Sequence, residues 1–186
     1  MVRISSLLQT ATNTVLFTPN KSKVSALTIT NVGVMVATML VGKWILASLP
    51  NIEVVSLFTI VYTVFFGSTA FFAVIVFIIV EGIIYGIGWW FYGYLLAWPI
   101  LFLIAYILRK RANRVNMSVA SALFGLSFGM LCGIPYGIMF GLKAAVAWWI
   151  AGIPYDILHG VGNFIICLFL YDPLIRALNV VKKTRP

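Results

Sequence analysis

The stretch that decides the fold is residues 118–163, SVASALFGLSFGMLCGIPYGIMFGLKAAVAWWIAGIPYDILHGVGN, which carries no charge before Lys143. In its first half a small residue returns at every fourth position. That spacing places the small residues in one row along a helix, where another backbone can approach closely. We therefore expect a helix with a packing surface formed by Ser121, Gly125, Gly129, Gly133, Gly137 and Gly141.

Polar residues follow in the second half of this stretch. Behind a pair of tryptophans come Asp156, His159 and Asn163, at positions i, i+3 and i+7. This spacing puts all three on one face of a helix. Two interpretations remain open: they form one wall of a ligand site together with aromatic residues, or they form an internal cluster in which His159 bonds to Asp156 or Glu81 and ties helices together.

The composition of the whole chain excludes an ordinary soluble domain. Of its 186 residues 62% are hydrophobic and only 9% are charged, with a mean hydropathy of +1.07. The net charge of +9 does not indicate a nucleic-acid partner, because 11 of the 13 basic residues lie in three clusters between or beyond the apolar runs. This is the positive-inside pattern of membrane proteins. The clusters are Arg3, Lys21 and Lys23; Arg109, Lys110, Arg111 and Arg114; and Arg176, Lys182, Lys183 and Arg185.

The sequence predicts an all-α integral membrane protein with about six transmembrane helices and both termini in the cytoplasm. The apolar run from 54 to 80 is read as two short helices broken at Gly67 and Ser68, because only then do all three basic clusters share one side. We expect a single transmembrane domain over 1–186, with an interfacial segment at 1–23. The predicted spans are 24–49, 54–67, 70–87, 95–108, 118–141 and 155–177.

Motifs for catalysis are absent from the sequence. It has no nucleophile elbow and no Walker A loop, and its single histidine has no neighbouring metal-ligand pattern. We therefore expect no metal, no cofactor bound by this chain and no enzymatic activity of its own. Two other classes stay open: a membrane-embedded enzyme that uses Glu81, Asp156 and His159, and a self-contained homo-oligomeric carrier with the glycine row as its subunit interface.

Several stretches together resemble a known family. These are the link Pro-Asn-Ile-Glu at 50–53, the Trp- and Tyr-rich stretch at 81–98, and Gly-Ile-Pro-Tyr-Asp-Ile-Leu-His-Gly-Val-Gly-Asn at 152–163. With about six short spans, the chain resembles the S component of energy-coupling factor (ECF) type vitamin transporters, which is their membrane-embedded substrate-binding subunit. The resemblance implies a vitamin pocket near the outer surface, covered by the first, third and fifth loops, here 48–53, 85–94 and 138–154.

The same resemblance implies partners and a location. A transmembrane coupling (T) subunit and two ATPases complete such a transporter in the bacterial plasma membrane, and ATP is used by those subunits. In the family an Ala-x-x-x-Ala pattern on the first helix meets the T subunit, and the nearest match here is Gly33 and Ala37. We expect partner docking or packing at Gly33, Ala37, Gly125, Gly129, Gly133 and Gly137.

The expected binding site combines scarce polar residues with aromatic residues of the outer half. Concave sites with aromatic walls and few polar groups suit flat or heterocyclic molecules. Strongly acidic substrates are disfavoured, because the outer half offers Lys43 and Lys143 as its only basic anchors, and Lys43 is expected to extend to the interface. We expect cobalamin as substrate, with pyridoxine-, queuosine- or hydroxymethylpyrimidine-type compounds as alternatives. The expected substrate-binding residues are Asn51, Glu53, Glu81, Tyr85, Trp89, Trp90, Tyr94, Trp148, Trp149, Asp156, His159 and Asn163.

Overall fold

The computed structural model describes residues 25–184, which are helical apart from short connections and contain no strand. This confirms the all-α class. The segment at 1–23, expected at the membrane interface, lies outside the described residues. The elements are α1 (Ala26–Ile45), α2 (Val55–Phe66), α3 (Thr69–Tyr85), α4 (Trp89–Leu108), the 3₁₀ turn η2 (Arg109–Arg111), α5 (Arg114–Phe140) and α6 (Leu142–Lys183).

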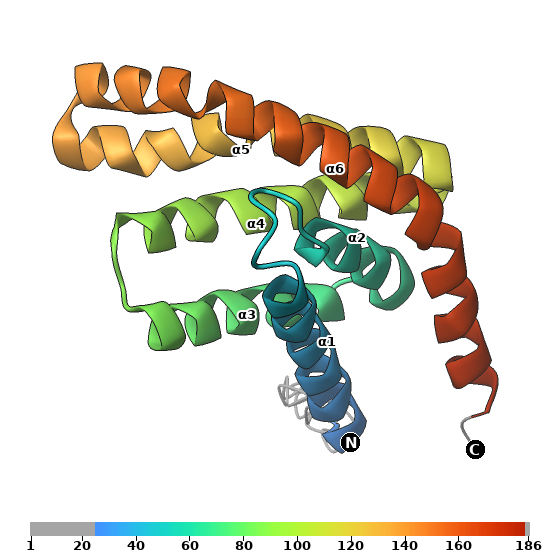
Figure 1. The fold of residues 1–186 in the computed structure, drawn as a ribbon. Helices are drawn as coiled ribbons and strands as arrows, with labels where there is room; N and C mark the ends of the chain where they lie inside the picture. The colour runs from blue at the N-terminus through green and yellow to red at the C-terminus, as the bar shows by residue number, and fades with distance from the viewer. Residues whose placement is uncertain (1–24, 185–186) are drawn as a thin grey trace, which may run out of the picture.

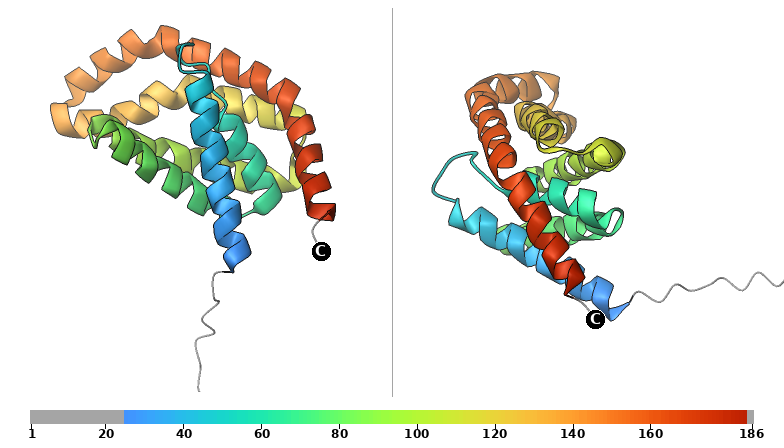
Figure 2. Two further views of the ribbon diagram at one scale, coloured as in Figure 1. Left: turned by 60° about the horizontal axis from the view of Figure 1, so that its bottom comes forward. Right: turned by 90° about the vertical axis from the view of Figure 1, so that its right-hand side faces the viewer.

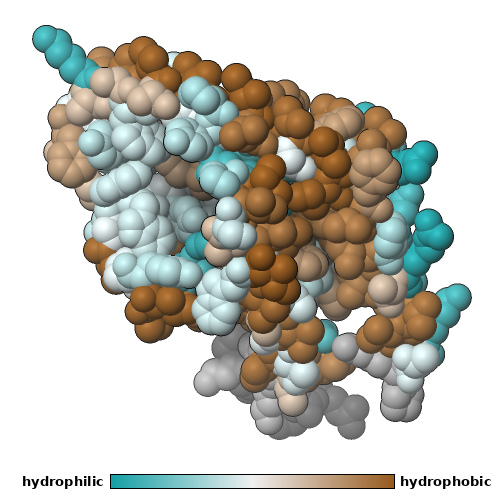
Figure 3. Space-filling model, in the orientation of Figure 1, coloured by the Kyte–Doolittle hydropathy of each residue, from teal (hydrophilic) through white to brown (hydrophobic). Residues whose placement is uncertain are grey.

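Several of these helices suit a membrane. Within the described residues, α1, α4 extended by η2, α5 and α6 are long and apolar enough to cross one. The helices α2 and α3 are equally apolar but shorter, with 12 and 17 residues. Hydrophobic side chains cover much of the face shown in Figure 3. Such a surface is stable only where lipid or another apolar partner covers it.

The longest helices form an antiparallel hairpin. α5 and α6 run side by side and are joined at Gly141, whose φ of +90° is a conformation that L side chains rarely adopt (Figures 1 and 2). On its other side α5 packs on α4, while α1 packs on α2 and α3. The start of α1 and the end of α6 lie at the same end of the molecule (Figure 1).

Local sequence explains where the helices begin and end. Ser25 caps the N-terminus of α1, with its side-chain oxygen accepting from the Thr28 N–H at 3.1 Å, and Asn113 caps α5 in the same way. The chain leaves α2 at Gly67 and α3 at Gly86, both with positive φ. The break between α2 and α3 at Gly67 and Ser68 lies where the basic clusters placed it.

Two expected loops are largely helical. A loop was expected at 85–94, but α4 begins at Trp89; the family resemblance implied a loop at 138–154, but α6 begins at Leu142. The reason is that backbone N–H and C=O groups in an apolar environment have no water to bond, so helical hydrogen bonds are favoured even in glycine-rich sequence. Pro154 is also accommodated inside α6. The connections that remain are the residues 86–88 and Gly141.

Candidate functional site

A first cavity lies between the α1–α2 loop and helices α4, α5 and α6. Its volume is about 220 Å³. Four of the residues expected in a binding site line it: Asn51 and Glu53 from the loop, Tyr94 from α4 and His159 from α6. These residues lie up to 108 positions apart in the chain, and the fold brings them to one space.

A second cavity of about 360 Å³ adjoins the first, between the ends of α1, α3 and α4. Lys43, Ala47 and Tyr94 line both cavities, and we call the two together the twin cavity. On the face shown in Figure 3, a paler, less hydrophobic hollow lies between the ends of α3 and α4 and the α5–α6 hairpin. Of the expected residues, the second cavity is lined by Glu81, Tyr85, Trp90 and Tyr94.

The loop that closes the first cavity is fixed to the helices around it. Asn51 adopts a φ of +54°, and its side-chain N–H donates to the Tyr155 carbonyl of α6 at 3.0 Å. Glu53 then lies at the start of α2, where its carboxylate accepts from the Ser56 N–H at 3.0 Å and from the Ser56 hydroxyl. A carboxylate at a helix N-terminus is favoured by the helix dipole. Helix capping therefore orients Glu53 at the cavity wall.

His159 is paired with Glu53 across the first cavity. Its Nε2 lies 3.2 Å from Glu53 Oε1, and its ring packs edge-on against Phe128 at 5.0 Å between centroids. One of the two open interpretations paired His159 with Asp156 or Glu81, but the partner in the structure is Glu53. The loop carries Glu53 over α6 and so supplies a carboxylate from elsewhere in the sequence.

Glu81 is fully buried in α3, with an exposure of 0%, and forms an ion pair with Lys43 of α1. Lys43 was expected to extend to the interface, and that prediction is wrong, because an unpaired buried carboxylate is costly and Lys43 is within reach. The Lys43 ammonium also lies 5.0 Å and 5.5 Å from the ring centres of Tyr85 and Tyr94. Next to it the Trp44 indole N–H donates to the Tyr85 hydroxyl at 3.1 Å.

Two buried polar atoms at the wall of the twin cavity have no hydrogen-bond partner within the described residues. One is the indole N–H of Trp98, and the other is Oε1 of Glu81. Buried polar groups normally have partners, because leaving them unpaired is unfavourable. Trp98 and Glu81 thus each add an unpaired polar atom to the residues that line the twin cavity.

Asp156 and Asn163 lie on the same helix as His159 but do not line the twin cavity. Asp156 accepts from the Gly129 N–H at 2.9 Å, within the α5–α6 interface. Asn163 donates to Ser56 Oγ at 3.1 Å and joins α6 to α2. Of the polar face expected on this helix, only His159 therefore lines the twin cavity, whereas the other two residues tie helices together.

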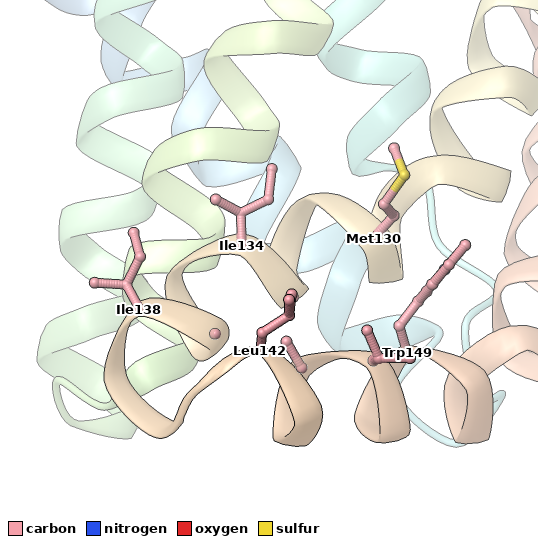
Figure 4. A pocket seen from close by; sticks show the side chains of 9 residues that line it. Met130, Ile134, Ile138, Leu142 and Trp149 are labelled. Carbon is pink, nitrogen blue, oxygen red and sulfur yellow. The ribbon is translucent and has the colours of Figure 1, made fainter.

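Three expected tryptophans lie elsewhere. Trp89 of α4 and Trp148 of α6 contact each other edge-on at 5.2 Å and both contact Tyr136. Trp149 lines an apolar groove of about 390 Å³ on the α5–α6 hairpin. Figure 4 shows this groove with its labelled side chains, all of them hydrophobic: Met130, Ile134, Ile138, Leu142 and Trp149.

The glycine row lies mainly inside the hairpin. A Cβ atom at Gly125 would lie 2.8 Å from Gly160 of α6, and one at Gly129 would collide with the Asp156 carboxylate. Gly137 lies close to Ala145, whereas a Cβ at Gly133 would make only an ordinary contact with Trp148. Gly33 and Ala37 are instead exposed on α1, with nothing within 4 Å of a Cβ at Gly33.

Among the residues of the twin cavity that sequence reasoning did not place in the site are one lysine and three aromatic residues. Lys43 carried a signal, since a lysine inside an apolar run needs an acidic partner such as Glu81. The remaining three are aromatic residues without a distinguishing pattern among many: Trp44, Trp98 and Phe128.

The donor set does not form a metal centre. Within residues 25–184, no group of three or more His, Cys, Asp or Glu side chains lies close enough to hold a metal ion. Both cysteines, Cys132 and Cys167, are buried as free thiols. The twin cavity therefore offers hydrogen bonds, the Lys43–Glu81 ion pair, the Glu53–His159 pair and aromatic faces.

No protein-family model matches this chain, and neither the curated proteins nor the solved structures include a significant match.

Proposed function

We propose that this chain is the substrate-binding S component of an ECF-type transporter and binds a vitamin-sized micronutrient in the twin cavity. The observation that carries the proposal is the convergence of residues on that cavity. The α1–α2 loop and the helices α3, α4 and α6 each contribute residues that were expected at the binding site. Its aromatic walls with a few buried polar atoms are typical of small-molecule sites.

In this proposal the chain crosses the membrane six times, with α2 and α3 as the two short spans. Both termini then face the cytoplasm, together with the basic residues of η2. The start of α1 and the end of α6 lie at one end of the molecule, which supports this orientation (Figure 1). The twin cavity then opens toward the outside, where a nutrient is captured.

The size of the cavities supports the smaller of the expected substrates. The two volumes, about 220 and 360 Å³, suit a compound of one or two rings. A corrinoid such as cobalamin is many times larger than one ring and would require the α1–α2 loop to move away. Pyridoxine-, queuosine- or hydroxymethylpyrimidine-type compounds are therefore favoured over cobalamin.

The two alternatives from other classes have less support. An enzyme using Glu81, Asp156 and His159 would need them at one reaction centre, but Glu81 and His159 line different cavities and Asp156 lies between α5 and α6. A homo-oligomeric carrier would need the glycine row as its subunit interface, but much of that row packs on α6 of the same chain.

Purification from membranes of the native host tests the proposal. The tagged chain should bring down a larger membrane protein and two ATPases, and uptake should require all of them. Ala37→Leu on the exposed face of α1 should reduce this association while leaving ligand retention intact. Ala151→Leu, an exposed alanine on α6, serves as the matched control. A chain that transports or catalyses alone would contradict the proposal.

A further inference from the structure

The Lys43 ammonium occupies an arrangement that recognises cations. It forms an ion pair with the Glu81 carboxylate and lies 5.0 Å from the ring centre of Tyr85 and 5.5 Å from that of Tyr94. A carboxylate supplies charge and aromatic faces supply a negative quadrupole, and together they favour an ammonium or a cationic ring nitrogen over other groups. The site for a positive charge is therefore built, and a side chain of the protein fills it.

The Lys43 side chain is the part of this arrangement that can move away from Glu81. Its side chain is 28% exposed, whereas that of Glu81 is completely buried. Lysine carries its charge on a flexible four-carbon chain with a strongly hydrated end, so the ammonium can swing to the interface. Glu81 cannot follow, and an unpaired carboxylate at that depth is unfavourable. The ammonium therefore leaves readily only when another positive charge takes its place.

The other charged groups of the twin cavity do not supply that charge. Glu53 adds a second carboxylate, paired with His159 and Ser56, and no second lysine or arginine lines either cavity within the described residues. The buried polar atoms without a partner support the same conclusion. Oε1 of Glu81 is an acceptor that Lys43 does not satisfy, and the N–H of Trp98, which lines the first cavity, is a buried donor without a partner within the described residues.

We infer that the twin cavity takes a small ligand with one positive charge, which replaces the Lys43 ammonium at Glu81 and accepts a hydrogen bond from Trp98. The inference rests on the proposed function, because it assigns a substrate class to the same cavity. Lys43 then acts as a resident cation: it keeps Glu81 paired in the empty protein and sets a threshold that neutral compounds do not overcome. The opposite role, in which Lys43 anchors an anionic ligand, predicts opposite effects of its removal.

Three probes with one pyridine ring separate these roles. They are 1-methylnicotinamide, which is cationic, nicotinamide, which is neutral, and nicotinate, which is anionic. Binding to the purified full chain is measured by calorimetry for the wild type, Lys43→Met and Glu81→Gln, with the exposed Lys143→Met as control. The cation should bind about tenfold more tightly than nicotinate, and Lys43→Met should tighten cation binding further by removing the competitor. Glu81→Gln should abolish the preference, and Lys143→Met should leave it unchanged.

The outcomes distinguish this inference from the proposed function. Tightest binding by nicotinate, lost in Lys43→Met, would make Lys43 an anion anchor and overturn the inference alone. A preference for the cation that survives Glu81→Gln would also overturn it. If no probe binds and mass spectrometry finds no small molecule retained by the chain, both the inference and the proposed function are contradicted. The double variant Lys43→Met with Glu81→Gln removes both charges together, so it folds without an unpaired one, and it should show no charge preference.

Discussion

Glu53, in the α1–α2 loop, keeps its negative charge because His159 and Ser56 stabilise the carboxylate. Burial by itself raises the pKa of Glu53, but the hydrogen bond and positive charge at His159 and the bonds from Ser56 outweigh burial and hold the pKa below its ordinary 4.5. The unfolded chain titrates at the ordinary value. This stabilisation is therefore present above the unfolded pKa and is lost as the pH falls through the folded pKa.

Thermal unfolding at a series of pH values tests this role of Glu53. The wild type in detergent should lose stability as the pH falls below the ordinary value of 4.5, since the carboxylate becomes protonated there. Glu53→Gln should unfold more easily at pH 7, by about 1 to 3 kcal/mol, and should show a flatter profile in the acidic range. Asp172→Asn, in the C-terminal half of α6, is the control for the loss of a carboxylate elsewhere in the chain. Parallel profiles for Glu53→Gln and the wild type would contradict this account.

Trp98 offers a test of a single hydrogen-bond donor. Its ring is buried among aromatic side chains, but its N–H has no partner within the described residues. Trp98→Phe removes the donor and keeps an aromatic ring, so the ligand-free protein should be within about 1 kcal/mol of the wild type in stability. Binding of the native ligand should weaken about tenfold, which is the loss of one hydrogen bond. Unchanged affinity by calorimetry would show that the ligand does not use this donor.

At the scale of secondary structure, the α5–α6 hairpin depends on close contact between the two helices. At Gly125 the backbone of α6 approaches so closely that a Cβ would lie 2.8 Å from Gly160, and at Gly129 the Asp156 carboxylate fills the space. The Gly129 N–H donates to that carboxylate. Asp156 and Gly129 thus fix the register of the hairpin, which in turn places His159 at the twin cavity.

Two glycine substitutions separate packing from helix propensity. Gly129→Ala places a methyl group on the Asp156 carboxylate, so we expect a loss of about 1 to 3 kcal/mol in stability. Gly33→Ala, in the middle of α1 with open space around it, should be neutral or gain up to about 1 kcal/mol. Both are measured by thermal unfolding in detergent. Equal effects at the two positions would mean that the hairpin contact adds nothing beyond helix propensity.

Helices were easier to predict from the sequence than their ends. The apolar runs and the break at Gly67 and Ser68 are visible in the pattern, because glycine and a polar residue interrupt an otherwise hydrophobic stretch. The glycine- and aromatic-rich stretches before Leu95 and before Tyr155 were assigned to loops, but they are mostly helical. Local composition favours turns there, whereas the apolar surroundings favour internal hydrogen bonds.

At the scale of the whole molecule, orientation in the membrane can be measured directly. The proposed topology puts the α3–α4 link outside and η2 inside. Ile87→Cys should react with a membrane-impermeant maleimide in intact cells, and Lys110→Cys should react only after the cells are opened. The two native cysteines are buried and should give little background. The reverse pattern of labelling would place the twin cavity on the cytoplasmic side.

The site was predictable where a residue carried charge in an apolar sequence, and less so elsewhere. Glu53, Glu81 and His159 stand out for that reason, and all three line the twin cavity. Asp156 is also a carboxylate in an apolar sequence, but it bonds to Gly129 within the α5–α6 hairpin. The packing of α5 on α6 determines this, and it cannot be read from the sequence of α6. Lys43 and Glu81 lie 38 positions apart on two different helices, so no local pattern encodes their pairing.

Native mass spectrometry of the chain purified in mild detergent tests the central claim most directly, namely that the twin cavity holds a small nutrient. The wild type should retain a small molecule in stoichiometric amount. His159→Ala, which opens the wall of the first cavity and removes the partner of Glu53, should lose it while remaining folded. The account would be contradicted if the wild-type chain neither retains a micronutrient nor binds an added one, or if the His159→Ala variant retains it fully.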